Sequence, residues 1–391
     1  KASKAEVSDG GKVLNIRVWN EEFRDRVIAH YPGYKKTGKW TGQIGDVKVK
    51  WTQVANDDNA YQQALDQALL NQADAKADDK VDMFLVEADY ALKYVNSDYT
   101  VDVVNDLGVS EDSLSNQYKY TQDIVRDSKG ALKGSSWQAC PAGMSCRRDI
   151  AKKVFGTDDP DKIQEIFSDW DAFKDAAAKL KDKGYLATAS VNDAYRVFSN
   201  NVSQKFVSDD KTLQLDSSIE NWIDKTKEYT DNGYNKKTSL WAKDWTAGMG
   251  KDGNVFGYFM PAWGINFSMA EGSGAKENGD GTFEAGGSYG DWAVCTGPQS
   301  FNWGGSFICG AAGTDNAALV KDIMQKLCCN QDIMYNISKD TQDFVNNKAA
   351  NEKLKEKGVT SDFLGGQSLV ETLSAAADKI DCSNVSPYDQ G

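Results

Sequence analysis

Short apolar runs and amphipathic segments alternate along the first part of the chain. Residues 13–19 (VLNIRVW) form an apolar run, and the segment after it repeats Phe23, Val27 and Tyr31 at four-residue spacing. Such runs are typical of strands, and such spacing is typical of a helix. Alternation between the two favours an open α/β sheet. The predicted elements are a strand at 13–19, a helix carrying Phe23, Val27 and Tyr31, a strand at 46–54, a helix carrying Tyr61, Leu65 and Leu69, and a strand at 81–87.

A similar alternation returns later and predicts a second α/β lobe between about residues 137 and 295. The glycine-rich, polar segment 271–292 predicts an extended hairpin or a surface loop. The apolar stripe of residues 313–329 predicts a helix, and a helical tail follows to about residue 381. Other predictions are a helix from Ser168 to Gly184, a strand at 185–190, a helix ending at Gly233 with Trp222 and Ile223 facing inward, and a strand at 254–261.

The length of 391 residues favours two lobes, because a single hydrophobic core rarely serves so long a chain. With 40% hydrophobic and 26% charged residues, the composition is that of a globular protein with substantial cores. No apolar run approaches the roughly 20 residues that a membrane-spanning helix requires. The polar opening, residues 1–12, is typical of a tether behind a leader that has been removed.

Charge and residue usage argue against several classes of partner. The net charge of −13 repels phosphate backbones, so we expect no nucleic-acid partner and a neutral or cationic ligand. The single histidine, His30, and the lack of a Cys/His cluster disfavour a metal site, and we expect no cofactor. Seven cysteines leave two disulfides open, Cys295–Cys309 and Cys140–Cys146, with small buried thiols as the alternative.

Polar and aromatic residues stand together where the predicted strands end. In open α/β sheets, ligands bind at the carboxyl ends of the strands. A sugar ring has apolar C–H faces that stack on aromatic rings, and it has hydroxyls that carboxylates and amides bind. Any single tryptophan can instead pack in a core, but the chain has 11 Trp and 16 Tyr. Site residues expected on these grounds are Asn20, Glu21, Glu87, Asp89, Tyr90, Asp193, Tyr195, Trp241 and Trp263.

A glycoside hydrolase is an alternative interpretation of the acidic residues. Glu21 with Glu22, or Glu87 with Asp89, could be taken for an acid and a nucleophile. Hydrolysis needs two carboxylates that face each other across one glycosidic bond, and neighbours in sequence do not establish such a pair. Acidic residues in the first turn of a helix are also favoured by the helix dipole alone.

Six segments occur in an order and spacing that together are specific: 13–23 (VLNIRVWNEEF), 81–90 (VDMFLVEADY), 134–150 (GSSWQACPAGMSCRRDI), 259–263 (FMPAW), 297–307 (GPQSFNWGGSF) and 363–367 (FLGGQ). They resemble the extracellular solute-binding proteins of carbohydrate ABC transporters, the maltose-binding-protein-like family that is commonest as lipoproteins in Gram-positive bacteria. None of the segments is a catalytic signature. The resemblance implies the two-lobed type II fold of the periplasmic binding proteins, with the ligand in the cleft between two α/β lobes.

The resemblance also implies how the chain divides. Lobe 1 would comprise residues 1–133 plus 298–328, and lobe 2 would comprise residues 134–297 plus 329–391. Three hinge crossings would lie near residues 133–137, 296–302 and 328–334.

Site residues follow from the resemblance position by position. Asn20 and Glu21 match a sugar-contacting loop, and Asp89 matches a carboxylate on the third-strand loop. Tyr90 departs from the family pattern, in which an arginine stands. Further matches implied by the resemblance are Trp137 and Gln138 near the hinge, Asp193 and Tyr195 in lobe 2, and Trp263 as a stacking ring; Trp303 and Gly304, with Phe301, belong to the segment 297–307, where Trp303 offers a ring to the cleft or caps a core.

The resulting functional prediction is a non-catalytic, monomeric receptor that closes on an oligosaccharide and delivers it to ABC transporter permease subunits. An N-terminal lipid anchor would hold it at the outer side of the cytoplasmic membrane. The first guess for the ligand is an α-gluco-oligosaccharide, with β-mannan, xylan and host-glycan fragments open. The alternatives are a glycan-active enzyme and an adhesin-like module for insoluble polysaccharide.

Overall fold

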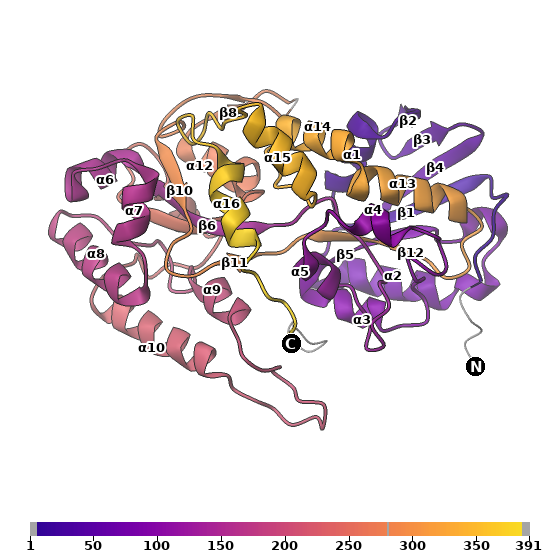
Figure 1. The fold of residues 1–391 in the computed structure, drawn as a ribbon, viewed down its shortest axis with the longest axis horizontal. Helices are drawn as coiled ribbons and strands as arrows, with labels where there is room; N and C mark the ends of the chain where they lie inside the picture. Colours follow the sequence, from indigo (N-terminus) through magenta and orange to yellow (C-terminus); the bar gives the residue numbers. More distant parts are fainter. Residues whose placement is uncertain (1–5, 280, 385–391) are drawn as a thin grey trace.

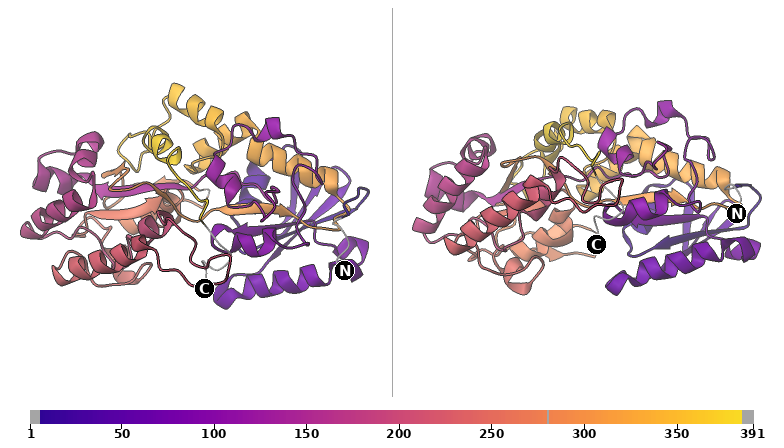
Figure 2. Two further views of the ribbon diagram at one scale, coloured as in Figure 1. Left: turned by 60° about the horizontal axis from the view of Figure 1, so that its bottom comes forward. Right: turned by 90° about the horizontal axis from the view of Figure 1, so that it is seen from below.

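The computed structural model describes residues 6–279 and 281–384 and consists of two lobes that lie side by side along its longest axis (Figures 1 and 2). Lobe 1 is built around a six-stranded sheet, and lobe 2 is built around a four-stranded sheet. Helices cover both sheets, and the described N-terminal segment lies on lobe 1 (Figure 1). The prediction of a two-lobed α/β fold is confirmed.

The lobe 1 sheet has the strand order β12-β5-β1-β4-β3-β2. Its centre is parallel, since β1 pairs in parallel with both β4 and β5. The edge strand β12 runs antiparallel to β5 and comes from a distant part of the sequence. The strands are β1 Val13–Val18, β2 Tyr34–Gly38, β3 Thr41–Ile44, β4 Val47–Gln53, β5 Met83–Glu87 and β12 Ser306–Gly310.

The three strands predicted for this lobe are confirmed as β1, β4 and β5. Strands β2 and β3 were not predicted, because they form a mostly solvent-facing hairpin whose residues lack an apolar alternation. Helix α1 (Glu22–His30) buries Phe23 and Val27, and helix α2 (Ala60–Leu70) buries Tyr61, Leu65 and Leu69, as their spacing predicts. The other helices around this lobe are α3 Ala91–Val95, α4 Glu111–Leu114, α5 Lys119–Asp123 and α13 Ala317–Cys329.

The lobe 2 sheet is antiparallel and centres on β6, which pairs with β10, β11 and β7. All seven residues of β6 are buried. The predicted hairpin at 271–292 is present as the pair β8 (Lys276–Glu277) and β9 (Phe283–Glu284). The sheet strands are β6 Pro141–Arg147, β7 Gly257–Pro261, β10 Trp292–Cys295 and β11 Phe301–Asn302.

The helices of the second half follow the predicted order. The predicted helix from Ser168 is α8 and the predicted tail contains three helices. The helices are α6 Arg148–Phe155, α7 Pro160–Ile166, α8 Trp170–Asp182, α9 Tyr195–Asn200, α10 Ser217–Asp231, α11 Lys243–Ala247, α12 Ala270–Ser273, α14 Gln331–Thr341, α15 Lys348–Glu356 and α16 Leu369–Ala377, with the π-helical turn η5 at Ile265–Met269.

The prediction of a strand at 185–190 is wrong. This segment makes only isolated bridges, Leu186 to Val255 and Ser190 to Thr238. The reason lies in Asp193, whose carboxylate accepts the backbone N–H groups of Ala189 and Ser190, each at 2.9 Å. Those N–H groups are therefore satisfied locally by a side chain and do not extend a ladder.

The prediction that Trp222 and Ile223 face inward is also wrong for Ile223. Helix α10 has no fully buried residue, and 49% of Ile223 is exposed. Trp222 is half-buried, and its ring meets the Tyr195 ring edge-on, with centroids 4.9 Å apart. Helix α10 therefore covers α9 from outside.

Two chain segments cross side by side between the sheets, and we name them linker A (136–140) and linker B (303–305). Linker A leads into β6, and linker B joins β11 of lobe 2 to β12 of lobe 1. Ser306 N donates to Gln138 Oε1 at 3.2 Å, and Trp303 N donates to the Cys140 carbonyl at 3.1 Å. The two linkers are thus hydrogen-bonded to each other and form a paired connection between the lobes.

Neither proposed disulfide is present, since all seven cysteines are free thiols. Cys295 lies in β10 of lobe 2, whereas Cys309 lies in β12 of lobe 1, so the two belong to different sheets. Cys140 and Cys146 are separated by the length of β6, and six extended residues span about 20 Å, which no disulfide bridges.

Candidate functional site

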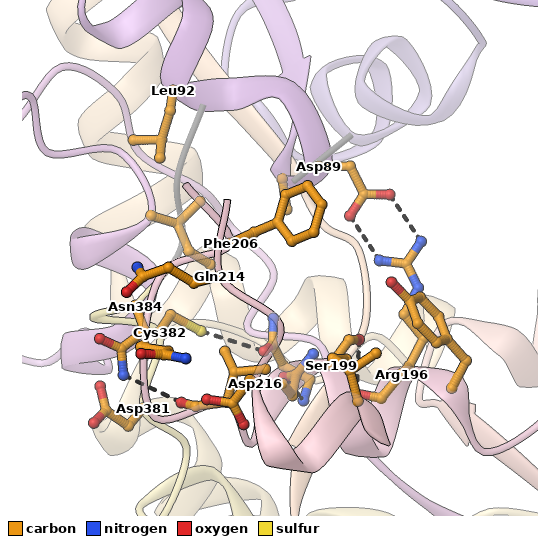
Figure 3. Close-up of a pocket in the computed structure, with 18 of the residues that line it drawn as sticks. Asp89, Leu92, Arg196, Ser199, Phe206, Gln214, Asp216, Asp381, Cys382 and Asn384 are labelled. Carbon is orange, nitrogen blue, oxygen red and sulfur yellow. Dashed lines mark hydrogen bonds and ion pairs between the residues drawn. The ribbon is translucent and has the colours of Figure 1, made fainter. Parts of the chain in front are cut away.

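An ion pair joins the two lobes at the ends of β5 and linker B. Asp89 follows β5 in lobe 1, and Arg196 lies in α9 of lobe 2. Arg196 Nη1 and Nη2 donate to Asp89 Oδ1 and Oδ2 at 2.7 and 2.8 Å, a bidentate pair (Figure 3). The guanidinium also lies over the Trp303 ring, 5.5 Å from its centroid. The Arg196 side chain is 29% exposed and the Asp89 side chain is 31% exposed, so a ligand can reach both.

Glu87, the last residue of β5, lies beneath this pair. Burial, followed by repulsion from Asp89, raises the pKa of Glu87 to about 8, against the opposing attraction of Arg196. Gly304 of linker B lies beside the Glu87 carboxyl, since a Cβ at this position would be 3.4 Å from Glu87 Oε1. Its φ of +69° is a backbone conformation that favours glycine. The site thus combines a protonated acid with a paired carboxylate at neutral pH.

The raised pKa of Glu87 predicts a pH-dependent stability. The folded chain keeps a proton on Glu87 that the unfolded chain releases above its usual pKa of 4.5. The free energy of unfolding therefore falls as the pH rises from about 4.5 to about 8, and it changes no further above that. Glu87→Gln should remove this contribution, so that the variant gains stability relative to the parent by about 3 kcal/mol between pH 5 and pH 8.

Urea unfolding of both proteins at pH 5 and pH 8 measures this difference. Groups remote from Glu87 titrate equally in the two proteins and cancel in the comparison. An identical pH dependence in the parent and in Glu87→Gln would contradict the assignment.

An aromatic cluster adjoins Arg196 on the side of lobe 2, and we define it as Trp241, Trp263, Phe267 and Trp303. Trp263 Nε1 donates to the Trp303 carbonyl at 2.9 Å, which ties the cluster to linker B. Phe267 meets Trp241 and Trp263 edge-on at 5.7 and 5.5 Å. Trp241 is 43% exposed and Phe267 is 68% exposed, so ring faces of this cluster are open to solvent.

A cavity of about 370 Å³ lies beside the ion pair and between the lobes. Lobe 1 contributes Ala88, Asp89, Leu92 and Ile124 to its wall, and the rest comes from the segments 195–219, 302–304 and 381–384 (Figure 3). Arg196 and Gly304 both line this cavity. Arg196 also lies over the Trp303 ring, and a Cβ on Gly304 would be 3.5 Å from Trp263 Cζ2. The cavity and the cluster are therefore adjacent.

The structure brings six of the thirteen expected site residues into this region: Glu87, Asp89, Trp241, Trp263, Trp303 and Gly304. Tyr195 joins them as a cavity-lining residue that is 38% exposed. Trp303 is largely buried, so it lies under the other rings of the cluster. A ligand contact at each of these residues stays a prediction.

Four other expected residues lie in or under lobe 1. Asn20 is exposed and its side chain accepts the Glu22 N–H at 3.1 Å, while Glu21 pairs on the surface with Arg24 at 3.3 Å and with Lys39 at 3.4 Å. Tyr90 is buried against Trp19 and Tyr94, and its hydroxyl has no hydrogen-bond partner. The fourth, Trp137, is fully buried in a stack with Phe23 and donates to Asp343 Oδ2 at 3.1 Å.

The remaining two expected residues are buried, and their side chains are hydrogen-bonded within the protein. Gln138 holds linker A to linker B, and Asp193 accepts Trp245 Nε1 at 2.8 Å in addition to its backbone contacts. In this conformation Trp137, Gln138 and Asp193 support the site from behind and do not face a ligand, which leaves a contact with ligand as a prediction for them too.

Sequence patterns did not single out Arg196 and Phe267. Arg196 directly follows Tyr195, but its meaning depends on Asp89, 107 residues earlier in the chain. Phe267 stands four residues after Trp263 in the π-helical turn η5, and such turns are frequent at functional sites. The four-residue spacing from Trp263 was the available signal for Phe267.

Nowhere in 6–279 or 281–384 do three or more His, Cys, Asp or Glu side chains gather in a way that could hold a metal ion. Among the helices of the same part of the chain, none has the length and apolar character needed to cross a membrane.

The sequence profile of the bacterial extracellular solute-binding proteins matches residues 35–362. The chain therefore belongs to this family, which confirms the predicted class of extracellular solute-binding protein. No curated protein matches the sequence significantly.

Solved structures with the same fold cover almost the whole chain. An extracellular solute-binding protein of family 1 has a TM-score of 0.73 at 17% identity, over 96% of this chain and 90% of that one. The ABC transporter-associated binding protein of B. animalis subsp. lactis Bl-04, in complex with β-1,6-galactobiose, has a TM-score of 0.65 at 19% identity, over 96% and 87%. The GacH receptor of Streptomyces glaucescens, solved unliganded and with acarbose, has a TM-score of 0.65 at 14% identity, over 98% and 89%.

Proposed function

We propose that the protein binds a neutral oligosaccharide between its lobes and presents it to the membrane subunits of an ABC importer. The observation that carries this proposal is the juxtaposition of exposed tryptophan and phenylalanine rings with the Asp89–Arg196 pair at the interlobe boundary. Membership in the solute-binding family supports transport, and the complexes of two proteins with the same fold, one with galactobiose and one with acarbose, support a carbohydrate ligand.

The chemistry of the site suits a sugar. The faces of Trp241 and Phe267 can stack on the C–H face of a pyranose ring. Asp89 and Arg196 already neutralise each other, so their remaining lone pairs and N–H groups can bind hydroxyls without leaving an unpaired charge. The raised pKa of Glu87 adds a carboxylic acid that both donates and accepts. A neutral, polyhydroxylated ligand can bind the exposed rings, the ion pair and the Glu87 carboxylic acid at the same time.

Closure of the lobes would couple binding to transport. A ligand that contacts Asp89 in lobe 1 and the aromatic cluster in lobe 2 stabilises the arrangement in which both contacts exist. The paired linkers A and B permit rotation of one lobe against the other while they keep the lobes in register. The permease subunits would then recognise the closed form.

We further propose the predicted division into lobe 1 (1–133 plus 298–328) and lobe 2 (134–297 plus 329–391), with the boundary near residue 298 moved to linker B because β11 pairs with β6 of lobe 2. We also propose a monomeric state and an N-terminal lipid anchor. α-Gluco-oligosaccharides remain the first candidates, ahead of β-mannan, xylan and host-glycan fragments.

A thermal-shift screen over purified oligosaccharides tests the proposed function. A ligand that binds only the folded protein raises the melting temperature by mass action, about 3–5 °C at a concentration of 100 times Kd. Malto-, galacto-, manno- and xylo-oligosaccharides form the panel. The absence of a shift with every member, together with a shift for an unrelated solute such as an amino acid, would refute the carbohydrate assignment.

A glycan-active enzyme is the alternative function. Glu87 and Asp89 lie on the same strand end in lobe 1, and Asp89 is held by Arg196, which does not suit a pair of carboxylates facing each other across a bond. Incubation of the protein with the sugars that shift its melting temperature, followed by chromatography, separates the two functions, since a binding protein leaves them intact. An adhesin-like module would instead be pulled down by insoluble polysaccharide without a preference for short chains.

A further inference from the structure

We infer that the cavity beside the Asp89–Arg196 pair accepts the apolar, ring-bearing aglycone of a small glycoside whose sugar lies on the aromatic cluster. This inference rests on the proposed function and narrows its substrate class. It concerns a part of the interlobe region that differs in chemistry from the stacking surface of Trp241 and Phe267.

Apolar atoms make up more than half of the free surface of the cavity. Its aliphatic and phenyl side chains come from α3 and the end of α5 in lobe 1, from the hairpin that connects α9 with α10, and from the start of α10 (Figure 3). Phe206 and Leu215 on the hairpin are 45% and 53% exposed, which leaves apolar area in water unless a ligand covers it. The aliphatic side chains offer apolar contact without hydrogen-bonding groups, and the Phe206 ring adds a face on which a planar group can stack, so this wall suits an apolar, ring-bearing group. The aliphatic lining residues are Leu92, Ile124, Val202, Leu215 and Ile219.

Three amide side chains in the wall are already bonded within the protein. Asn302 Oδ1 accepts the Cys382 thiol at 3.3 Å, and Asn384 Nδ2 donates to the Val202 carbonyl at 3.1 Å. Gln214 Nε2 donates to the Lys205 carbonyl at 2.8 Å. Each of these amides therefore uses one of its donor or acceptor atoms within the fold, so fewer hydrogen-bonding groups in the wall remain for the hydroxyls of a sugar.

The hairpin that carries Phe206 and Leu215 is held in place before any ligand arrives. The buried Asp216 carboxylate accepts the Ser203 N–H at 2.8 Å, the Ser203 hydroxyl at 2.7 Å and the Ser218 N–H at 2.8 Å. Val207 and Leu213 form an antiparallel bridge across it. A wall that is ordered in advance costs a ligand little conformational entropy.

Size and position complete the assignment. A cavity of about 150 Å³ is enough for benzene, so about 370 Å³ holds an aglycone of one or two rings but little more. Arg196 and Gly304 stand between this cavity and the tryptophans of the cluster. A glycoside can therefore place its sugar on the rings and its aglycone in the cavity through one glycosidic oxygen.

Matched pairs of methyl and phenyl glycosides test the inference by calorimetry, with glucose, galactose, mannose and maltose in both anomeric forms as the sugars. In at least one pair the phenyl glycoside should bind about tenfold or more tightly than the methyl glycoside. Leu215→Asn should remove most of this advantage and leave the methyl glycoside unaffected. Leu213→Asn is the matched control, because Leu213 lies on the same hairpin, is 72% exposed and is not part of the cavity wall.

Phe206→Ala serves as a second variant, and urea unfolding checks that each variant is folded. Equal affinity within every pair, or an advantage that survives both Leu215→Asn and Phe206→Ala, would overturn the inference. Because the oligosaccharide screen is measured separately, sugar binding without any aryl advantage rejects the aglycone site alone. Failure of both the glycosides and the screen rejects the proposed function as well.

Discussion

Replacing Trp263 by alanine is expected to weaken oligosaccharide binding by at least about tenfold. Its ring packs against the rings of Trp241, Phe267 and Trp303, and its Nε1 donates to the Trp303 carbonyl. The alanine variant therefore loses a stacking surface and also releases the two exposed rings. Calorimetry with the oligosaccharide that gives the largest thermal shift measures the loss.

Trp263→Phe separates the two contributions. It keeps an aromatic face but loses the donor to linker B, so we expect an affinity between those of the parent and Trp263→Ala. The free energy of unfolding of each variant, from urea titration, shows whether the fold is retained. Unchanged affinity in a folded Trp263→Ala protein would remove this residue from the site.

Breaking the ion pair is expected to have an effect of similar size. Asp89→Asn and Arg196→Gln should each lower affinity about tenfold, because each leaves one partly buried charge without its partner and removes a group that binds hydroxyls. The pair also connects the lobes in the absence of ligand. Small-angle scattering should therefore show a larger radius of gyration for both ligand-free variants than for the parent.

The reversed pair, Asp89→Arg with Arg196→Asp, is the control for this prediction. It restores an ion pair between the lobes but places each charge on the wrong side for the ligand. We expect the ligand-free radius to return toward that of the parent while the affinity stays low. Full affinity in either single variant would show that the pair serves structure alone.

Much of lobe 1 follows from local patterns. The run that became β5 is apolar because both of its faces are covered, whereas β1 and β4 alternate between a buried face and a more exposed one. The apolar stripes of α1 and α2 are buried, as their spacing predicts. Patterns failed where a local bond from a side chain to the backbone competes with strand pairing. The segment 185–190 reads as a strand, but the Asp193 carboxylate takes its N–H groups.

The sequence predicted which types of side chain form the candidate site, but it predicted only some of the individual residues. Strand ends pointed to Glu87, Asp89 and Trp263, which the structure brings into one region. Trp137 was predicted for the site as well, but its ring is fully buried against Phe23 and packs behind the linkers. No local pattern distinguishes a tryptophan with an open face from one without it, because exposure depends on which remote segments pack over the ring.

The sequence by itself determined the class of fold, the central strands and helices, the family and the chemical character of the site, since hydrophobic periodicity and composition are local properties of the chain. The tertiary structure decided which charges meet, as with Asp89 and Arg196, and which rings stay open, as with Trp241 and Phe267. It also decided that a cavity exists beside them. These features depend on distances between residues far apart in the chain, and only the packing of the two lobes sets those distances.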